Sequence, residues 1–265
     1  MYSSRSEHDY SVNCYSPDGR IYQLEYANEA VKLGSTSIGI QTSEGVVLAA
    51  EKRLHSKLLE PASVSKIFEI DHHIGTVLSG MVGDARILIE HARVESQNHR
   101  FTYNQPMPVE SCALSTCDLS LQFGEGRKKK MLSRPFGVSL LIGGVGDTGP
   151  ELWVTDPTGT YTKYEAKAIG QGAEAANTML VEQYHRRMTI KDAVRLAISI
   201  LKAVMEDKAT KLNMDVAVVA VPPAGQPVKL KLLSTDELEA ELGGVAGSAA
   251  GAAAAGGGGG DAASS

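Results

Sequence analysis

The sequence predicts an α+β fold, a four-layer αββα sandwich in which two antiparallel sheets face each other between outer layers of helices. Three observations indicate it. Strand-like runs come in adjacent pairs joined by short polar turns, which is typical of hairpins. Helix-like segments also come in pairs, so each pair returns the chain to the edge of the sheet that it left. Strands and helices do not alternate singly, so a parallel sheet built from βαβ units is not expected.

The first half of the chain begins with a helix. Residues 16–19, Ser-Pro-Asp-Gly, have the composition of a β-turn, and a helix is expected to follow to about Leu33, where Gly34 is a typical stop. Two hairpins and then two helices come next. The strands are expected at 35–42, 45–53, 65–70 and 73–81, and the helices at 84–101 and 108–124.

The second half of the chain repeats this order. A turn is expected at 156–159, Asp-Pro-Thr-Gly. The last helix, at 234–242, is expected to begin with a capping box in which Ser234 and Glu237 exchange hydrogen bonds. The strands are expected at 136–145, 151–156, 160–166, 214–221 and 228–233, and the other helices near 172–187 and 189–206.

Composition favours one large domain, because the chain has 265 residues, of which 43% are hydrophobic. We divide it into a polar, mobile segment at 1–17, an αββα domain at 18–242 and a disordered tail at 243–265 that is almost entirely Gly, Ala and Ser. The formal net charge of −5 argues against a general nucleic-acid binder. The sequence contains no stretch of about 18 apolar residues, so no membrane-spanning helix is expected. No signal peptide is expected either.

The cysteines are Cys14, Cys112 and Cys117, an odd number without a CxxC pair. A disulfide framework or a zinc site is therefore not expected, and a reducing, intracellular compartment fits best. We expect the three thiols to be buried as small apolar groups.

The first helix has an unusually wide apolar face. At about 100° per residue, Glu25, Asn28, Glu29 and Lys32 share one narrow side, and apolar or aromatic residues fill an arc of roughly 200°. An ordinary surface helix presents a stripe of about 100° to its core. Either this helix is sunk deep in its own domain, or it is buried on two sides, against its own domain and against neighbouring subunits.

Several motifs of common enzymes are absent from the sequence, among them GxSxG, HExxH and the Walker loop. Gly144, Gly146 and Gly149 satisfy GxGxxG, but a strand rather than a helix follows them, so a hairpin loop is expected instead of a dinucleotide site. No cofactor is expected.

Two further patterns have simple interpretations. His91, Glu95 and His99 recur every four residues on one helix and could line up as metal ligands, but charged residues at this spacing are far commoner on a solvated face, and no metal is expected. The basic run at 126–130 is expected to be a solvated loop, with a nuclear-import contact as a weaker alternative.

The N-terminal stretch YSPDGRIYQLEYANEAVKLGSTSIGI, residues 15–40, closely resembles the signature of proteasome alpha subunits. The resemblance covers about residues 5–242. Within the family, residues 92–104 and 133–138 are most similar to one particular alpha type. Other matching segments are GVVLAAEKR (45–53), LLEPASVSKIFEIDHHIG (58–75), SGMVGDARILIEHARVESQNHRFTYN (79–104), MLSRPFGV (131–138), YHRRMTIKDAV (184–194) and STDELEAEL (234–242).

This resemblance implies the αββα fold of the N-terminal nucleophile hydrolases. It also implies a place, with six other alpha subunits, in an outer ring of the 20S core particle, above the beta-ring subunits that hold the peptidase sites. The first helix would lie at the ring interfaces and over the beta ring, which would explain its wide apolar arc. Cytoplasm and nucleus are the implied locations, and ubiquitin-dependent and other proteasomal degradation is the implied process.

The first residue of a catalytic beta chain after cleavage is a threonine, and its free amine acts as the base. By alignment, Ser35 stands at the nucleophile position, Glu51 at the position of an aspartate and Lys66 at that of a lysine. However, Gly34 acylates Ser35, and cleavage there would remove the first helix. The resemblance therefore implies a non-catalytic subunit.

Other family roles map onto residues near both ends of the first helix. The position of Lys66 lines a pocket between neighbouring subunits that receives the C-terminal carboxylate of regulatory particles, including proteasomal ATPases, and an ammonium suits a carboxylate. Gly19 and Gly34 belong to the same surroundings. From the sequence alone, an ordinary lysine at the end of a strand is the favoured interpretation of Lys66.

The segment before the turn forms the gate over the substrate channel in this family. The open gate uses a tyrosine, an aspartate, a proline and a second tyrosine, and the matching positions are His8, Asp9, Pro17 and Tyr26. The usual YDR is HDY here, so a register shift would be needed to bring Tyr10 to the place of the first tyrosine. The basic run at 126–130 also departs from the acidic insert usual at this place.

Two alternatives to the structural role stay open. A self-processed hydrolase would have Ser35 as its nucleophile, and its mature chain would begin at that residue. A free-standing binding module with the same fold would be a stable monomer, against which the wide apolar arc of the first helix argues.

Overall fold

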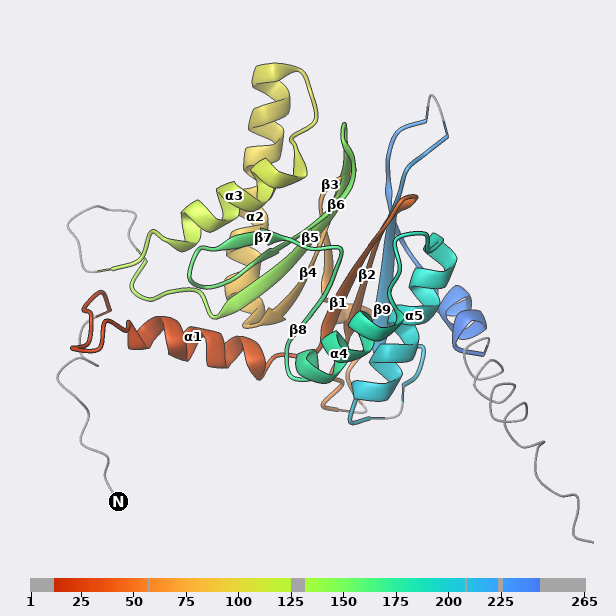
Figure 1. Cartoon of the computed structure of the whole chain (residues 1–265), viewed down its shortest axis with the longest axis horizontal. Helices are drawn as coiled ribbons and strands as arrows, with labels where there is room; N and C mark the ends of the chain where they lie inside the picture. Colours follow the sequence, from red (N-terminus) through yellow and green to blue (C-terminus); the bar gives the residue numbers. More distant parts are fainter. Residues whose placement is uncertain (1–11, 57, 125–131, 208, 224–225, 244–265) are drawn as a thin grey trace, which may run out of the picture.

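Two five-stranded antiparallel sheets lie face to face, with a pair of helices on the outer side of each (Figure 1). The computed structural model describes residues 12–56, 58–124, 132–207, 209–223 and 226–243. The predicted αββα sandwich is thus confirmed. The basic run at 126–130, most of the segment at 1–17 and nearly all of the tail at 243–265 lie outside the described residues.

The first sheet has the strand order β10-β9-β2-β1-β8 and takes its strands from both ends of the chain. The hairpin of β1 and β2 is joined by a two-residue turn, with Thr42 paired to Gly45. All seven residues of β2 are buried, as expected of a central strand with both faces covered. The strands are β1 (Ser37–Thr42), β2 (Gly45–Glu51), β8 (Ala166–Ile169), β9 (Met214–Ala220) and β10 (Leu230–Leu232).

The second sheet has the order β3-β4-β5-β6-β7, so each strand pairs with its neighbour in sequence. A short 3-10 helix, Pro61–Ser63, precedes it. Between the two sheets lies an apolar core to which Leu48 and Ala217 contribute from the first sheet and Val77, Leu141 and Leu152 from the second. The strands are β3 (Ile67–Asp71), β4 (Ile74–Gly80), β5 (Val138–Gly146), β6 (Gly149–Thr155) and β7 (Tyr161–Lys163).

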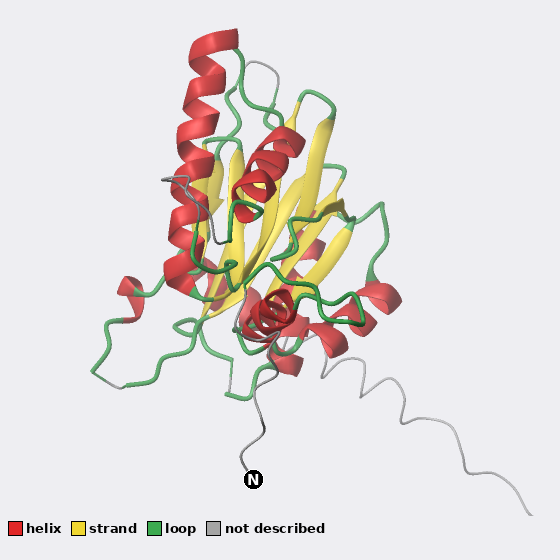
Figure 2. Cartoon of the chain, turned by 90° about the vertical axis from the view of Figure 1, so that its left-hand side faces the viewer, coloured by secondary structure: helices red, strands yellow, loops and turns green. Residues whose placement is uncertain are grey.

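Four helices cover the outer faces of the sheets. Two of them, α2 (Val82–Tyr103) and α3 (Val109–Ser120), pack on the second sheet, and α4 (Ala173–Gln183) and α5 (Ile190–Val204) pack on the first. Figure 2, in which helices are red, shows α2 and α3 in front of the strands, with α1 seen end-on below them. Residues 235–243 are also helical, and Leu238 of this helix packs in the apolar core between the first sheet and its helices.

The predicted turns and caps are confirmed. Residues 146–149 close the β5–β6 hairpin, with Gly146 paired to Gly149, so the GxGxxG match is a hairpin loop. In the turn at 156–159 the Gly159 amide donates to the Asp156 carbonyl oxygen at 3.1 Å. The capping box forms as well, because the Ser234 amide donates to Glu237 Oε2 at 2.8 Å and the Glu237 amide to Ser234 Oγ at 3.3 Å.

Two predictions about local structure are wrong. The strand expected at 160–166 is two strands in different sheets, because β7 pairs with β6 and β8 pairs with β1. Cys112 and Cys117 are buried as expected, and burial raises the pKa of each thiol to about 12, but Cys14 is exposed. All three thiols are free.

A carboxylate on α2 holds the segment that leads into β5. Asp84 accepts two hydrogen bonds from the Arg134 guanidinium, at 2.6 and 2.9 Å, and one from the Gly137 amide at 3.0 Å. Burial by itself would raise the pKa of Asp84, but these hydrogen bonds and the charge of Arg134 outweigh it and lower the pKa below 3.8. The matching segment MLSRPFGV thus has a structural role in this chain.

Replacing Asp84 by alanine is expected to lower the free energy of unfolding by about 2–3 kcal/mol, because the Gly137 amide and the guanidinium both lose their acceptor. Arg134→Ala should cost less, because the guanidinium is half exposed. The ionised carboxylate stabilises the fold above pH 3.8, and this contribution is lost as the pH falls through the lower folded value. Urea unfolding followed by the fluorescence of Trp153, the one tryptophan, measures both effects, and equal losses in the two variants would contradict the assignment.

Candidate functional site

The helix before the first strand, α1 (Tyr22–Lys32), lies along the edge of the molecule and contacts β4 and β5 (Figure 1). Among its residues only Ala27 and Val31 are buried. Tyr26 is 53% exposed, and Leu33, which caps the helix, is 73% exposed. The helix is therefore not sunk deep in its own domain, and part of its apolar arc is exposed. Burial on two sides, the second alternative above, stays a prediction.

The turn before α1 fixes how the chain enters the helix. The Gly19 amide donates to the Ser16 carbonyl oxygen at 2.9 Å, and the Arg20 amide donates to Ser16 Oγ at 3.1 Å. Gly19 has φ +76°, a conformation that residues with a side chain seldom adopt. Pro17 lies exposed in this turn.

The other end of α1 is packed tightly against the sheets. The Gly34 amide donates to the Val31 carbonyl oxygen at 3.0 Å, and the Gly34 carbonyl oxygen accepts from the Gln171 amide at 2.9 Å. A Cβ at Gly34 would lie 2.2 Å from the Gly80 nitrogen and 2.4 Å from Ser79 Oγ. The junction between the helix and the first strand therefore admits no side chain at this position.

Ser35 follows directly and is buried, and its hydroxyl has no hydrogen-bond partner in the described part of the chain. Its carbonyl oxygen accepts from Ser79 Oγ at 3.0 Å. The backbone nitrogen of Ser35 is part of the peptide bond to Gly34, and an amide nitrogen cannot act as a base. An attack by this hydroxyl would need a free amine of the kind that activates an N-terminal nucleophile.

Glu51 and Lys66 complete the set that the alignment places around Ser35. Glu51 Oε2 accepts from the Thr36 amide at 3.0 Å. Lys66 is half buried directly before β3 and makes no hydrogen bond or ion pair with the other described residues. Burial lowers the pKa of the Lys66 amine, the nearby charge of Arg53 lowers it further, and Glu51 partly offsets both effects. The site thus holds an unpaired ammonium, a chemical partner for an anion.

Within one chain the three residues of the predicted docking pocket do not meet. The charge of Arg53 lowers the pKa of Lys66, and Arg53 donates to the carbonyl oxygen of Leu33, the residue before Gly34. Gly19 lies beyond the opposite end of α1, an 11-residue helix about 16 Å long. A pocket that contains all three positions would need the Gly19 turn of an adjacent chain.

The predicted gate residues are only partly described. His8 and Asp9 lie outside the described residues. Pro17 is in the exposed turn, and the ring of Tyr26 stacks on that of Tyr22 with 6.4 Å between centroids. Both described residues of the predicted gate cluster are thus exposed, Pro17 in the turn before α1 and Tyr26 within the helix.

Two polar residues of the site escaped sequence reasoning. Arg53 follows β2, and its guanidinium donates to the Leu33 carbonyl oxygen at 3.1 Å and to Gln171 Oε1 at 2.5 Å. Gln171 in turn donates from Nε2 to Glu206 Oε1 at 2.8 Å. A basic residue after a strand is too common to be a signal, and nothing in the sequence marks Gln171.

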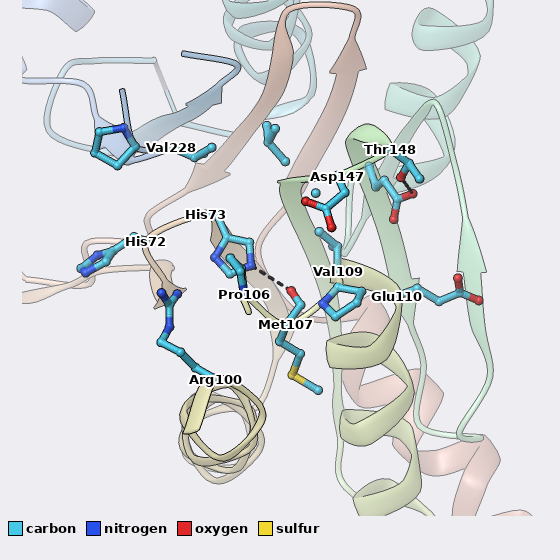
Figure 3. Close-up of a pocket in the computed structure, with 15 residues that line it drawn as sticks. His72, His73, Arg100, Pro106, Met107, Val109, Glu110, Asp147, Thr148 and Val228 are labelled. Carbon is cyan, nitrogen blue, oxygen red and sulfur yellow. Dashed lines mark hydrogen bonds between the residues drawn. The ribbon is translucent and has the colours of Figure 1, made fainter. Parts of the chain in front are cut away.

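A cavity of about 500 Å³ lies at the far end of β4 from Gly34, between the β3–β4 turn and the α2–α3 connection. Figure 3 shows His73 directed toward the Met107 backbone, to which its Nε2 is hydrogen-bonded at 2.8 Å. Arg100, at its edge, binds Asp71 at 3.0 Å. The cavity contains none of the predicted site residues, and its buried histidine serves the connection between helices.

The histidines at helical spacing have separate partners. His91 Nε2 contacts Ser115 Oγ at 3.0 Å, and His99 Nδ1 contacts the Gln105 carbonyl oxygen at 3.2 Å. In the ranges that the structure describes, no group of three or more His, Cys, Asp or Glu side chains could hold a metal ion. The described helices include none that is long and apolar enough to cross a membrane.

Comparison with known proteins gives consistent matches. Residues 31–219 match the family model described as "Proteasome subunit", and residues 8–30 match a second model, which describes the N-terminal signature of the A-type proteasome subunits. The chain is 65% identical to "Proteasome subunit alpha type-5" of Trypanosoma brucei brucei, over 83% of this chain and 90% of the relative. It is 53% identical to the protein of the same name from Dictyostelium discoideum, over 90% and 97%. It is also 53% identical to "Probable proteasome subunit alpha type-5" of Schizosaccharomyces pombe, over 83% and 90%.

Proposed function

The chain belongs to the proteasome subunit family and carries its alpha signature, and from this premise we propose that it is a non-catalytic subunit of the alpha ring of the 20S core. It would share the ring with six other alpha subunits, above the beta-ring subunits. Residues 1–17 would form the gate segment and residues 18–242 the ring domain. The tail at 243–265 would follow this domain. Cytoplasm and nucleus are the proposed locations, and ubiquitin-dependent and other protein degradation is the process that it would serve.

The observation that carries this proposal is the junction of α1 with the first strand. Ser35 is in mid-chain with its nitrogen acylated, and Gly34 is packed against the Gly80 backbone. Cleavage before Ser35 would detach α1, whose exposed Tyr26 and Leu33 form the face offered to neighbours. Native mass spectrometry of the endogenous assembly, followed by the intact mass of this chain, tests it. We expect a very large complex containing a chain that retains the residues before Ser35.

The competing function is a hydrolase with Ser35 as its nucleophile. The observation in its favour is the buried Ser35 hydroxyl, without a partner among the described residues, next to Thr36, whose amide binds Glu51. It requires a mature chain that begins at Ser35. A measured mass equal to residues 35–265 would support this alternative and refute the structural role.

Docking of regulators is the second part of the proposal. The unpaired ammonium of Lys66 would receive the C-terminal carboxylate of a regulatory particle, such as a proteasomal ATPase, in a pocket that includes Gly34 and has the Gly19 turn of the adjacent chain as its other wall. The gate cluster would consist of His8, Asp9, Pro17 and Tyr26. Half-burial of Lys66 supports this role, because a partly desolvated ammonium binds a carboxylate more strongly than an exposed one does.

Lys66→Ala is expected to weaken binding of a carboxylate tail at this pocket roughly 10- to 100-fold, the equivalent of one charge-assisted hydrogen bond. Assembly should be unchanged, because no described residue relies on Lys66 for a hydrogen bond. The probe is a peptide of about ten residues with a free C-terminal carboxylate and a photo-crosslinker, titrated on the complete particle. The yield of crosslinking to this chain, measured as a function of peptide concentration, gives the affinity of the peptide.

The matched control is Lys231→Ala, which removes an exposed lysine of β10 that pairs with Glu237. It should leave crosslinking unchanged, and a peptide with a C-terminal carboxamide should label neither protein. Equal labelling of the wild type and of Lys66→Ala would refute the docking role. Total activation by regulators is a weaker readout, because the other pockets of the ring could compensate.

A further inference from the structure

The connection between α4 and α5 carries a charge pattern that the rest of the chain does not repeat. Arg186 and Arg187 lie three and two positions before Thr189, and no other serine or threonine of the sequence has arginine at both of these positions. Protein kinases select their substrates partly by such charge patterns. A kinase whose substrate groove is lined by carboxylates binds guanidinium groups at these positions through charge-assisted hydrogen bonds. The connection therefore has the sequence of a substrate for a kinase directed by basic residues.

The structure presents these three residues to solvent. Thr189 is exposed. Arg187 is exposed as well, and it makes no hydrogen bond or ion pair with the other described residues. The side chain of Arg186 is 82% exposed and pairs with Glu165 at the surface, and exposed ion pairs of this kind contribute little to stability. Both guanidinium groups are thus available to the carboxylates of a second protein.

Two serines also follow an arginine by three positions, but neither is presented in this way. Ser96 is fully buried on α2, and its Oγ donates to a carboxylate of β3 at 2.7 Å. Ser56 is exposed, but the guanidinium of Arg53 before it already donates to a backbone carbonyl oxygen and to a side-chain amide. Of the three residues, only Thr189 combines an exposed hydroxyl with a preceding guanidinium that is free of described partners.

Two local contacts hold Thr189 in the folded chain. Its Oγ1 accepts from the Asp192 amide at 3.2 Å and donates to Asp192 Oδ2 at 2.7 Å, which caps α5. The preceding residue, Met188, is 7% exposed and packs in the core between the first sheet and its helices. A kinase groove binds its substrate as an extended segment, so Met188 and the cap must come free before transfer. Since residues 185–187 are exposed, this opening releases one buried side chain and costs much less than global unfolding.

We propose that Thr189 is a phosphorylation site for a serine/threonine kinase that recognises two arginines. Thr189 Oγ1 attacks the γ-phosphorus of ATP, the bond from that phosphorus to the oxygen that bridges it to the β-phosphorus breaks, and ADP leaves with the bonding electrons. The hydroxyl proton passes to the catalytic carboxylate of the kinase. In the product, Oγ1 carries phosphorus in place of hydrogen, so it can no longer donate to Asp192. Modification therefore changes the cap of α5 and places about two negative charges beside the Asp192 carboxylate.

Incubation of the complete particle with ATP and a purified kinase selective for arginine at these two positions tests the proposal. Site-resolved mass spectrometry gives the initial rate of phosphate incorporation at each residue. We expect incorporation at Thr189 and none at Ser56 or Ser96. A synthetic peptide of residues 183–195 is the positive control, and it should react about tenfold faster than the particle or more, because it needs no local opening.

Arg187→Ala should lower the rate at Thr189 by roughly tenfold or more, the equivalent of one charge-assisted contact. The matched control, Lys191→Ala, removes an exposed cation two positions after Thr189 instead of before it. It should change the rate by less than about threefold, so it separates recognition by position from general attraction. Thr189→Val should leave the connection without phosphate.

Three results would overturn the proposal. One is a phosphorylated peptide beside a particle that stays unmodified at Thr189. Another is a peptide that a kinase active on its standard substrate does not phosphorylate. The third is an equal loss of rate in Arg187→Ala and Lys191→Ala. Since both variants replace exposed side chains, both are expected to fold and to enter particles.

Discussion

Replacing Gly34 by alanine is expected to destabilise the fold by about 3 kcal/mol or more, because the added methyl group meets the Gly80 backbone and a Ser79 side chain that is held by hydrogen bonds. Its Cβ would lie 2.2 Å from the Gly80 nitrogen and 2.4 Å from Ser79 Oγ. Ser79 cannot rotate away freely, since its hydroxyl donates to the carbonyl oxygens of Val31 and Ser35. Relief requires α1 to move away from β4, so the variant should also be depleted from assembled particles.

The matched control is Gly83→Ala on α2, where an added Cβ would meet nothing within 4 Å. Alanine is the better helix former, so the free energy of unfolding should stay the same or rise by at most about 1 kcal/mol. Urea unfolding followed by Trp153 fluorescence, and the fraction of each variant incorporated into particles, measure the difference. A fully incorporated Gly34→Ala chain of wild-type stability would show that the junction is not tightly closed.

Asp215→Ala is expected to cost about 3–5 kcal/mol, because it leaves the ammonium of Lys52 buried without a counter-charge. Lys52 Nζ lies 2.8 Å from Asp215 Oδ1, and the two side chains are 8% and 12% exposed. Lys52 directly follows β2 and Asp215 lies in β9, so the pair connects the ends of two strands that are neighbours in the first sheet. Loss of Asp215 should therefore loosen the pairing at the middle of this sheet.

A double variant separates the charge effect from packing. Lys52→Met combined with Asp215→Leu should recover most of the lost stability, because an apolar pair of similar volume replaces a buried ion pair at little net cost. The exposed pair of Lys32 and Glu29 on α1 is the control, and Glu29→Ala should change stability by no more than about 0.5 kcal/mol. If Asp215→Ala is as mild as Glu29→Ala, the buried pair is not a structural link.

Most of the fold could be predicted from the sequence, because its signals are local. Alternation of apolar residues and short polar turns locate the hairpins, and the helix at Ile190–Val204 carries both an apolar face and a capping Thr189 whose side chain accepts from the Asp192 amide. Segment ends were less accurate, as with the helix expected to 187 that stops at Gln183, where Tyr184 is extended. No residue pattern at the end of that helix marks the change.

Non-local features could not be predicted in this way. The strand expected at 160–166 is divided between the two sheets, because β7 pairs with β6 whereas β8 pairs with the edge of β1 that faces away from β2. This long-range pairing leaves no mark in the local sequence pattern. The positions of Ser35, Glu51 and Lys66 came from the family resemblance, and the family itself is confirmed by the comparisons. The hydrogen bond between Arg53 and Gln171 joins residues more than a hundred positions apart, so periodicity gives no sign of it.

The order of strands in the two sheets has a consequence for how the chain folds. The second sheet pairs each strand with the next in sequence, and only the connection from β4 to β5, which contains α2 and α3, is long, so all its pairings become available as soon as β7 leaves the ribosome. The β1–β2 hairpin is made first but must wait with both edges unpaired until β8 and β9 are synthesised. Unpaired edges are sites of aggregation. The nascent chain is thus most prone to aggregation after the β1–β2 hairpin has formed and before β8 and β9 can pair with it.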